Sequence, residues 1–288
     1  MTPFELAEPR TLREAVALLA AGDAPVRAIA GGTALMLMMK AGVFQPARLV
    51  SLRRVEAHHA QIAATPDGGL RIGALATLSS LARSVAVRQA APVITQTLKT
   101  LSNVRVRNVA TLGGHLAHGD PHMDLPPVLV ALGAQVRTLS PAGERTLAVG
   151  ELYTGYYETV LADNELITEI MVPLRTGWRA AYMKITTRAA DDWPTLGVAV
   201  SLRMESNRVQ DARIVVSAAT NTPLRLTAAE DTLRGASLDA AALARCGDAA
   251  ASGVDLAADA HGSTAYKCEL LRVYTQRALR QAMGNISN

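Results

Sequence analysis

Two pairs of adjacent glycines constrain this 288-residue chain more than any other feature of its sequence. Gly31-Gly32 lies between a strand predicted over 26–30 and a helix predicted over 34–41, and Gly113-Gly114 ends a non-periodic stretch that starts at Asn103. Adjacent glycines let backbone N–H groups converge on an anion because no Cβ blocks the approach. A helix that follows adds the positive end of its dipole. Two such turns predict a diphosphate held from both sides.

A single glycine pair usually marks an ordinary turn, so this prediction depends on the presence of two. Neither pair fits the G-x-x-x-x-G-K-S/T pattern of P-loops or the G-x-G-x-x-G pattern of Rossmann units. Both of those nucleotide-binding folds are therefore disfavoured.

The hydrophobic pattern divides the chain into three segments. The first segment is predicted as a βαβ-like unit. It comprises a helix over 11–21, the strand and the helix on either side of Gly31, and a strand over 48–52. The second mixes strands with helices. Its predicted strands lie at 70–74, 135–139 and 166–172, and its helices begin at Thr77, Ala91 and Asp124, with Asp124 as a cap.

The third segment begins near Trp178 and is predicted as an antiparallel meander followed by helices. The strands are expected over 180–186, 196–204 and 208–219. One helix is expected to start at a capping box formed by Thr227-Ala228-Ala229-Glu230, and two more are expected over 239–251 and 263–283. The mixture of separate helices and antiparallel strands predicts an α+β fold class.

Composition excludes several classes of function. The chain has 29 Lys and Arg against 25 Asp and Glu, but the basic residues form no run of five, so a nucleic-acid-binding arm is not expected. Aromatic residues make up only 3% of the chain, which disfavours modules that stack RNA bases. No apolar run approaches the roughly 18 residues of a spanning helix, and the first residues do not resemble a signal peptide, so a cytoplasmic location without a membrane span is expected.

Two cysteines, Cys246 and Cys268, are too few for a disulfide scaffold or a four-cysteine iron–sulfur cluster. We expect both to be reduced thiols.

The segments around the two glycine pairs resemble the motifs of a known family. The run Ala28-Ile29-Ala30-Gly31-Gly32-Thr33, followed by a helix, resembles the first FAD motif of the flavin-binding medium subunit of the molybdenum hydroxylases, the xanthine dehydrogenase and carbon monoxide dehydrogenase family. The second motif is matched by Val106-Arg107-Asn108-Val109-Ala110-Thr111-Leu112-Gly113-Gly114-His115, then His118-Gly119-Asp120-Pro121 and Asp124-Leu125-Pro126. Residues 184–200 resemble a third family landmark, so the resemblance covers nearly the whole chain.

The resemblance implies a domain organisation. A two-part FAD-binding domain would occupy residues 1–177, with parts at about 1–58 and 59–177. A C-terminal domain of antiparallel sheet with helices, like that of carbon monoxide dehydrogenase flavoproteins, would occupy residues 178–288.

The resemblance also implies the cofactor contacts. The backbone of one turn would surround the FAD diphosphate, through Ala28, Ile29, Ala30, Gly31, Gly32, Thr33, Ala34 and Leu35. The second motif would contact it from the other side, through Thr111, Gly113, Gly114 and His115. Asp124 would accept a hydrogen bond from a flavin-side hydroxyl, Ile167 would lie on the strand that passes the ring, and Lys184 would be a basic contact. Trp193 lies where some relatives place an aromatic side chain against the isoalloxazine; the alternative is a core tryptophan at a domain junction.

Two residues depart from the family pattern. Ala34 stands where the family usually has an acid, so a side-chain contact is absent there. His115 replaces an asparagine, and the charge of a histidine depends on pH.

The same histidine raises the question of a metal. His115, His118 and His122, with Asp120 and Asp124, have a spacing that suits zinc. However, the cluster lies inside the matched FAD motif, and Pro121 interrupts any helix that would align the rings. No metal site is therefore predicted.

The function implied by the resemblance is that of a non-covalent FAD-binding electron-transfer subunit in a heterotrimer. A large subunit with molybdopterin would hydroxylate the substrate, and a small subunit with 2Fe–2S clusters would pass electrons to this flavin, which would deliver them to an external acceptor. No catalytic acid or base is needed in this chain. Two alternatives stay open: a stand-alone FAD-dependent reductase or oxidase on a related fold, and a flavin-free docking module.

Overall fold

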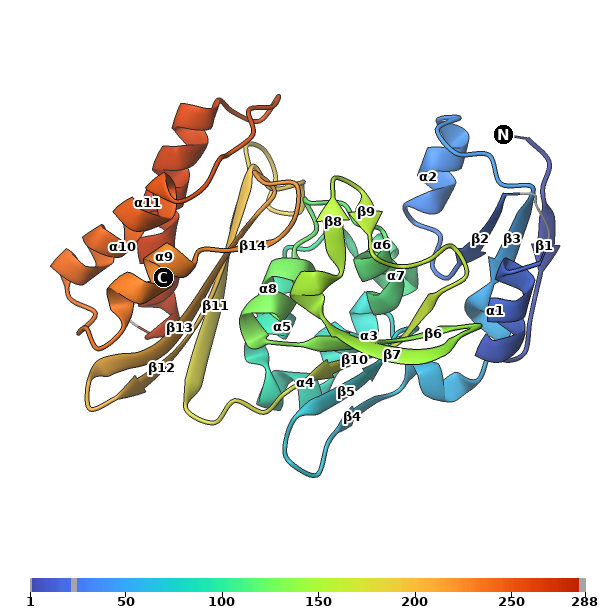
Figure 1. Cartoon of the computed structure of the whole chain (residues 1–288), viewed down its shortest axis with the longest axis horizontal. Coiled ribbons are helices and arrows are strands. Elements are labelled where there is room, and N and C mark those ends of the chain that lie inside the picture. Colours follow the sequence, from blue (N-terminus) through green and yellow to red (C-terminus); the bar gives the residue numbers. More distant parts are fainter. Residues whose placement is uncertain (1, 22–24, 285–288) are drawn as a thin grey trace.

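The computed structural model describes residues 2–21 and 25–284. Figure 1 shows three parts in a row, which follow the chain from the N-terminal part (blue) through the middle part (green) to the C-terminal part (orange and red). Among the described helices, none is long and apolar enough to cross a lipid bilayer.

The N-terminal part is a parallel sheet with the strand order β1-β3-β2. Its strands are β1 (Glu5–Ala7), β2 (Val26–Ile29) and β3 (Arg48–Ser51), and its helices are α1 (Leu12–Leu19) and α2 (Leu35–Lys40). The Thr11 hydroxyl caps α1 by accepting a hydrogen bond from the Glu14 N–H, as predicted. The βαβ unit around Gly31 is confirmed. β1 was not predicted, because three residues carry little periodic signal.

The middle part contains an antiparallel sheet with the order β4-β5-β10-β6-β7. The strands are β4 (Ile62–Ala64), β5 (Leu70–Gly73), β6 (Gln135–Ser140), β7 (Gly143–Ala148) and β10 (Leu166–Val172), and β8 (Tyr153–Gly155) pairs with β9 (Glu158–Thr159). The α-helices are α3 (Leu78–Arg83), α4 (Val85–Ala90), α5 (Pro92–Thr97), α6 (Val104–Val109), α7 (Leu112–Ala117) and α8 (Leu125–Leu132). Short 3-10 helices are η1 (Leu52–Arg54), η2 (Ala57–Ala60) and η3 (Val149–Glu151).

The C-terminal part is an antiparallel sheet with helices on one face. Its strands β11 (Trp178–Ile185), β12 (Leu196–Glu205), β13 (Arg208–Ser217) and β14 (Leu224–Arg225) lie in sequence order. Helices α9 (Thr227–Leu233), α10 (Ala240–Ser252) and α11 (Thr264–Ala282) follow, and Asp239 and Ser263 cap the last two. The predicted meander and both long helices are confirmed.

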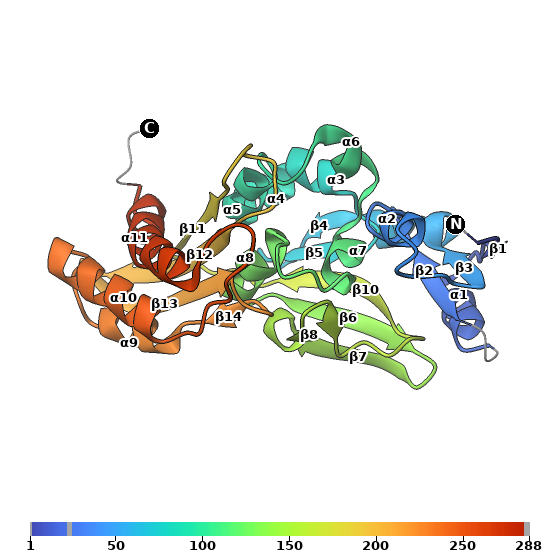
Figure 2. The ribbon, with the colours of Figure 1, turned by 90° about the horizontal axis from the view of Figure 1, so that it is seen from above.

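The sheet of the C-terminal part also packs against the middle part. Along β12, Val198 and Val200 belong to the C-terminal core, whereas Ala199 between them belongs to the core of the middle part. This alternation follows from the two-residue period of a strand. The buried helix α8 contacts β12 and β13, and the Ser201 hydroxyl donates to the Ala131 carbonyl at 2.7 Å. Figure 2 shows α8 and α11 on opposite sides of this sheet.

Two local predictions were wrong. Residues 103–115 are not irregular: they form α6 and α7, which are capped by Asn103 and Thr111. Thr227 does not cap α9, since Leu226 occupies the cap position and the Glu230 carboxylate accepts a hydrogen bond from the Ile214 N–H instead.

Candidate functional site

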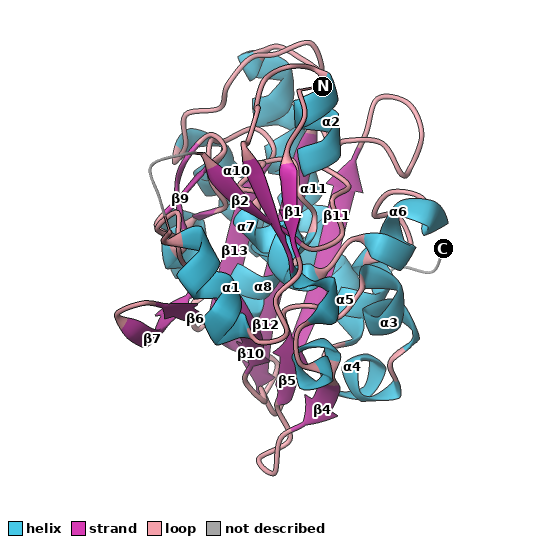
Figure 3. Ribbon diagram, turned by 90° about the vertical axis from the view of Figure 1, so that its right-hand side faces the viewer, coloured by secondary structure: helices cyan, strands magenta, loops and turns pink. Residues whose placement is uncertain are grey.

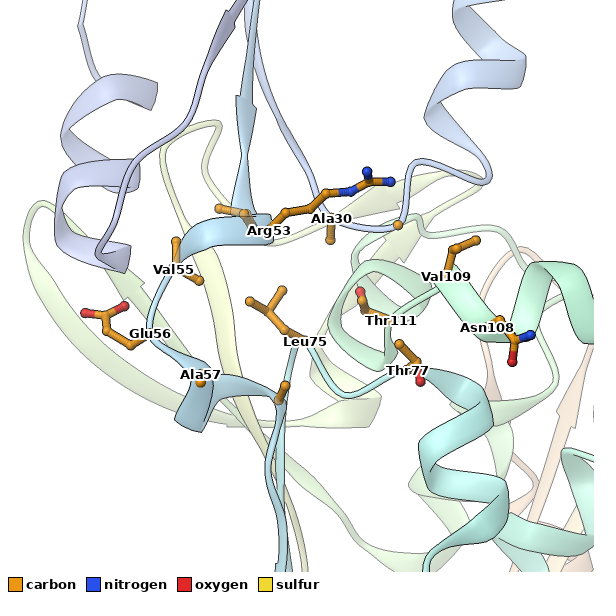
Figure 4. Close-up of a pocket in the computed structure, with 13 residues that line it drawn as sticks. Ala30, Arg53, Val55, Glu56, Ala57, Leu75, Thr77, Asn108, Val109 and Thr111 are labelled. Atoms are coloured by element: carbon orange, nitrogen blue, oxygen red, sulfur yellow. The ribbon is translucent and has the colours of Figure 1, made fainter.

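A cavity of about 530 Å³ lies between the N-terminal and middle parts (Figure 4). That volume lies within the usual range for small-molecule sites. Segments far apart in sequence line it, with Ala30, Leu75 and Thr111 around the same space. The complete lining is Ala30, Gly31, Leu52, Arg53, Val55, Glu56, Ala57, Ala60, Leu75, Thr77, Asn108, Val109 and Thr111.

The first glycine turn lies at the edge of this cavity and needs both of its glycines. A Cβ on Gly31 would lie 2.1 Å from the Val109 carbonyl oxygen, so only glycine permits the contact between the β2–α2 turn and α6. Gly32 has a φ of +73°, which is the left-handed region. The turn therefore brings the two predicted motifs into direct contact.

The backbone N–H groups of this turn have no protein acceptor. Those of residues 31–35 donate to nothing within the described chain, and the first hydrogen bond of α2 runs from the Met36 N–H to the Gly32 carbonyl at 3.0 Å. All of these residues are partly buried. The first N–H groups of a helix have no acceptor within it, and here the left-handed Gly32 adds the N–H groups of the turn before α2. A run of free N–H groups of this kind can bind an anion.

The second glycine pair differs from the expected turn, because it lies within α7. The Gly113 N–H donates to the Ala74 carbonyl at 2.7 Å, and the Gly114 N–H donates to the Thr111 hydroxyl at 3.2 Å. A Cβ on Gly113 would lie 2.6 Å from the Ala74 Cβ. These N–H groups are therefore bonded within the protein, and their contact with a diphosphate stays a prediction.

His115 follows this pair and is buried, with no hydrogen-bond partner for its Nε2. Burial, together with the charges of His118 and Lys184, lowers the pKa of His115 to about 4, although Asp120 opposes the shift. The ring is therefore neutral at neutral pH. Its Nε2 is a buried hydrogen-bonding group without a partner in the described part of the chain.

Asp124 forms a buried pair with Lys184. The Lys184 Nζ lies 3.0 Å from Asp124 Oδ2 and also donates to the Thr100 carbonyl at 2.9 Å, and the Tyr182 hydroxyl donates to Asp124 Oδ1 at 2.8 Å. Burial raises the pKa of Asp124, and Lys184 and Tyr182 counteract it. Asp124 does not cap α8 with its side chain, which corrects that prediction, because its oxygens bind these donors from β11.

Ile167 and Trp193 differ in burial and in their neighbours. Ile167 is a buried core residue of β10. Trp193 is 53% exposed, so it is not a core tryptophan, and it lines a second cavity of about 320 Å³. That cavity lies between the middle and C-terminal parts and includes His122, Tyr156 and His261. The structure thus places Ala30, Gly31 and Thr111 at the first cavity and Trp193 at the second.

The histidine cluster does not form a metal centre in residues 2–21 and 25–284, since nowhere there do three suitable side chains converge. The His122 Nδ1 instead lies 2.9 Å from Asp120 Oδ1.

Several polar side chains near these sites were missed as site residues, Glu56 and Thr77 of the first cavity among them. Arg53 on η1 lines the first cavity and brings a positive charge to it, and Asn108 lines the same cavity from α6. Tyr182 binds Asp124. The signal for Tyr182 was present in the sequence, because residues two apart on a strand share a face, and Lys184 was already a candidate.

Comparison with known proteins agrees with this geometry. Residues 2–175 match the family model for the FAD binding domain in molybdopterin dehydrogenase, and residues 181–282 match that for the CO dehydrogenase flavoprotein C-terminal domain. The carbon monoxide dehydrogenase medium chain of Hydrogenophaga pseudoflava is 33% identical over 284 residues, which cover 97% of this chain and 96% of that one. The nicotine 6-hydroxylase medium subunit of Paenarthrobacter nicotinovorans is 32% identical, with 96% of each chain covered.

Solved structures show the same similarity. Carbon monoxide dehydrogenase from Hydrogenophaga pseudoflava, in a form that lacks the Mo-pyranopterin moiety, superposes with a TM-score of 0.94 at 33% identity over 100% of both chains. Quinoline 2-oxidoreductase from Pseudomonas putida 86 gives a TM-score of 0.92 at 28% identity over 99% of both chains. The predicted resemblance and the α+β fold are confirmed. The chain belongs to the FAD-binding medium-subunit family of the molybdenum hydroxylases, a family of oxidoreductases.

Proposed function

We propose that this chain is the electron-transfer subunit of a heterotrimeric molybdenum hydroxylase, which takes electrons from a 2Fe–2S subunit and passes them to an external acceptor. The observation that carries the proposal is the turn at residues 31–35, whose free N–H groups suit the diphosphate of the family's cofactor. FAD supplies the redox chemistry when bound, while the protein supplies position and electrostatics.

The residues of the first motif have one role in this proposal. The free N–H groups of Gly31, Gly32, Thr33, Ala34 and Leu35 would hold the diphosphate. Ala28, Ile29 and Ala30 would bring the chain to it from β2, where Ala28 and Ile29 pair with β3. Arg53 lines the same cavity, so its guanidinium adds a positive charge there.

The second motif has a more limited role on the opposite side. Thr111 lines the cavity, and the unpaired Nε2 of His115 supplies one hydrogen-bonding group. Gly113 and Gly114 would contribute mainly by letting α7 approach closely, because their N–H groups are bonded within the protein.

The ring end of the cofactor would meet the remaining candidates. Asp124 retains acceptor capacity beyond its bonds to Lys184 and Tyr182, since a carboxylate has about four lone-pair sites. Ile167 would border the ring, and Trp193 would place its indole against it. No residue of this chain acts as a catalytic acid or base in the proposal.

Partner subunits are part of the proposal. Cys246 is buried on α10 and Cys268 is half-buried on α11, and neither has a role in holding a cluster. The iron–sulfur relay and the molybdopterin would therefore belong to a small and a large subunit. We also propose a cytoplasmic location and a boundary near residue 177 between the FAD-binding and C-terminal domains.

The test is to tag this chain in its native host and to analyse what co-purifies. We expect FAD together with two further chains, one that contains molybdenum and one that contains iron and acid-labile sulfide. If the chain purifies alone with FAD and turns over NADH or a small substrate, it is a stand-alone reductase or oxidase. If it purifies without flavin, it is a docking module.

A further inference from the structure

Trp193 is held by a ring from another part of the molecule. It lies on the connection between β11 and β12, and the His122 imidazole, just before α8, stacks against it. The two ring centroids are 5.4 Å apart and the planes differ by 13°. This near-parallel geometry is one that aromatic pairs prefer. The stack therefore fixes the plane of a half-exposed indole.

Asp120 in turn fixes the His122 ring. One oxygen, Oδ1, lies 2.9 Å from both the backbone nitrogen and the Nδ1 of His122. Burial acts to raise the pKa of Asp120, but the hydrogen bonds from His122 outweigh it and hold that pKa below its usual value. Because a carboxylate only accepts hydrogen bonds, Nδ1 must carry the proton and the ring has one orientation.

The burial of Asp120 points to a purpose other than stability. Its side chain is completely buried, and that of His122 is only 10% exposed. Buried charges carry a desolvation penalty that a pair often fails to recover. Here the charge serves to orient one imidazole, and that imidazole supports the indole.

Both rings face the second cavity. His122 and Trp193 line it, and the His261 ring lies 6.4 Å from the His122 ring across it. The part of the indole that His122 does not cover is therefore open to a planar group.

We propose that His122, oriented by Asp120, is a positioning residue for Trp193 and sets the plane in which the indole meets the flavin ring. This inference depends on the proposed contact between Trp193 and the flavin. It gives a role to the histidine whose spacing in the sequence pointed to zinc.

The first experiment examines the stack without flavin. In a Trp178→Phe background, Trp193 is the only tryptophan, so acrylamide quenching of the flavin-free full-length chain reports its exposure. His122→Ala should raise the quenching constant, and His122→Phe, which keeps a flat ring but has no bond to Asp120, should restore it only in part. His58→Ala, at an exposed histidine on η2, is the matched control and should change nothing. An unchanged quenching constant in His122→Ala would overturn the inference.

The second experiment uses the flavin-loaded complex and measures FAD affinity and the visible circular dichroism of the flavin. Trp193→Ala should weaken affinity by about 2- to 10-fold and alter the spectrum, the range expected for one aromatic pair. His122→Ala should change the spectrum in the same direction, and His122→Phe, which lacks the bond to Asp120, should reverse the change only in part. If Trp193→Ala alters the flavin but His122→Ala does not, the positioning role is wrong. If neither variant alters the flavin, the proposed contact between Trp193 and the flavin is wrong, whatever the result of the quenching experiment.

Discussion

Lys184 Nζ lies 3.0 Å from Asp124 Oδ2, and this buried pair joins the sheet of the C-terminal part to the start of α8. Both side chains are almost inaccessible to water, with 7% and 5% exposed. Thr100 and Tyr182 provide the remaining hydrogen bonds. The pair joins two residues that the family resemblance places at the same cofactor.

Removal of the lysine charge should destabilise the chain strongly. Lys184→Met leaves the Asp124 carboxylate buried without its cation, which typically costs about 3–5 kcal/mol. The free energy of unfolding, measured by urea denaturation of the flavin-free chain, should fall by that amount.

The control for this variant is an exposed ion pair. Arg234→Ala breaks a pair with Asp231 in which both side chains are mostly exposed, and should cost less than about 1 kcal/mol. Equal losses of unfolding free energy in the two variants would show that the buried Asp124–Lys184 pair contributes no more stability than an exposed pair.

His115 should make stability depend on pH. Its pKa is about 4 in the folded chain, against 6.5 for an ordinary histidine, so between these values the unfolded chain binds more protons. Stability should therefore decrease as pH falls from about 6.5 to about 4, by up to about 3 kcal/mol from this group. The slope of unfolding free energy against pH in the flavin-free chain measures it.

His115→Asn restores the residue of the family motif and removes the titrating group. The slope of unfolding free energy against pH should therefore become smaller in this variant. Identical slopes for wild type and His115→Asn would mean that His115 is not buried as described.

Gly113→Ala should act through packing. The new Cβ would lie 2.6 Å from the Ala74 Cβ and 2.9 Å from the Ala74 oxygen, so α7 must shift away from the β5–α3 connection. Overpacking of this kind costs about 1–3 kcal/mol. Thermal unfolding should detect the loss, whereas Gly150→Ala, whose nearest contact would be 3.7 Å away, should be close to neutral.

Long periodic signals account for the elements predicted in the C-terminal part. The strands β11 to β13 and the helices α10 and α11 extend over enough residues for alternation or helical spacing to be visible, and Asp239 and Ser263 mark the helix starts. The helices α6 and α7 have six residues each, too few for a reliable pattern. α7 also depends on the contact between Gly113 and Ala74, which local sequence does not encode.

Misassigned caps have a physical cause as well. Asp124 and Glu230 have the sequence positions typical of capping groups, but each binds a partner from a strand, Lys184 and Arg225 respectively. Charge-assisted bonds of this kind compete with a backbone N–H. The sequence placed the first glycine turn between a strand and a helix, as in the structure, while the position of Trp193 at another cavity depends on tertiary packing.

The most direct measurement of the central claim is the FAD content of the native complex that is isolated through this chain. Wild type and Gly150→Ala should carry stoichiometric FAD. In Gly31→Ala, the new Cβ would lie 2.1 Å from the Val109 oxygen and displace the turn, so FAD affinity should fall at least about 10-fold, equivalent to the loss of one charge-assisted hydrogen bond. Wild-type FAD content and affinity in Gly31→Ala, in a chain that folds normally, would contradict the assignment of this turn as the diphosphate site.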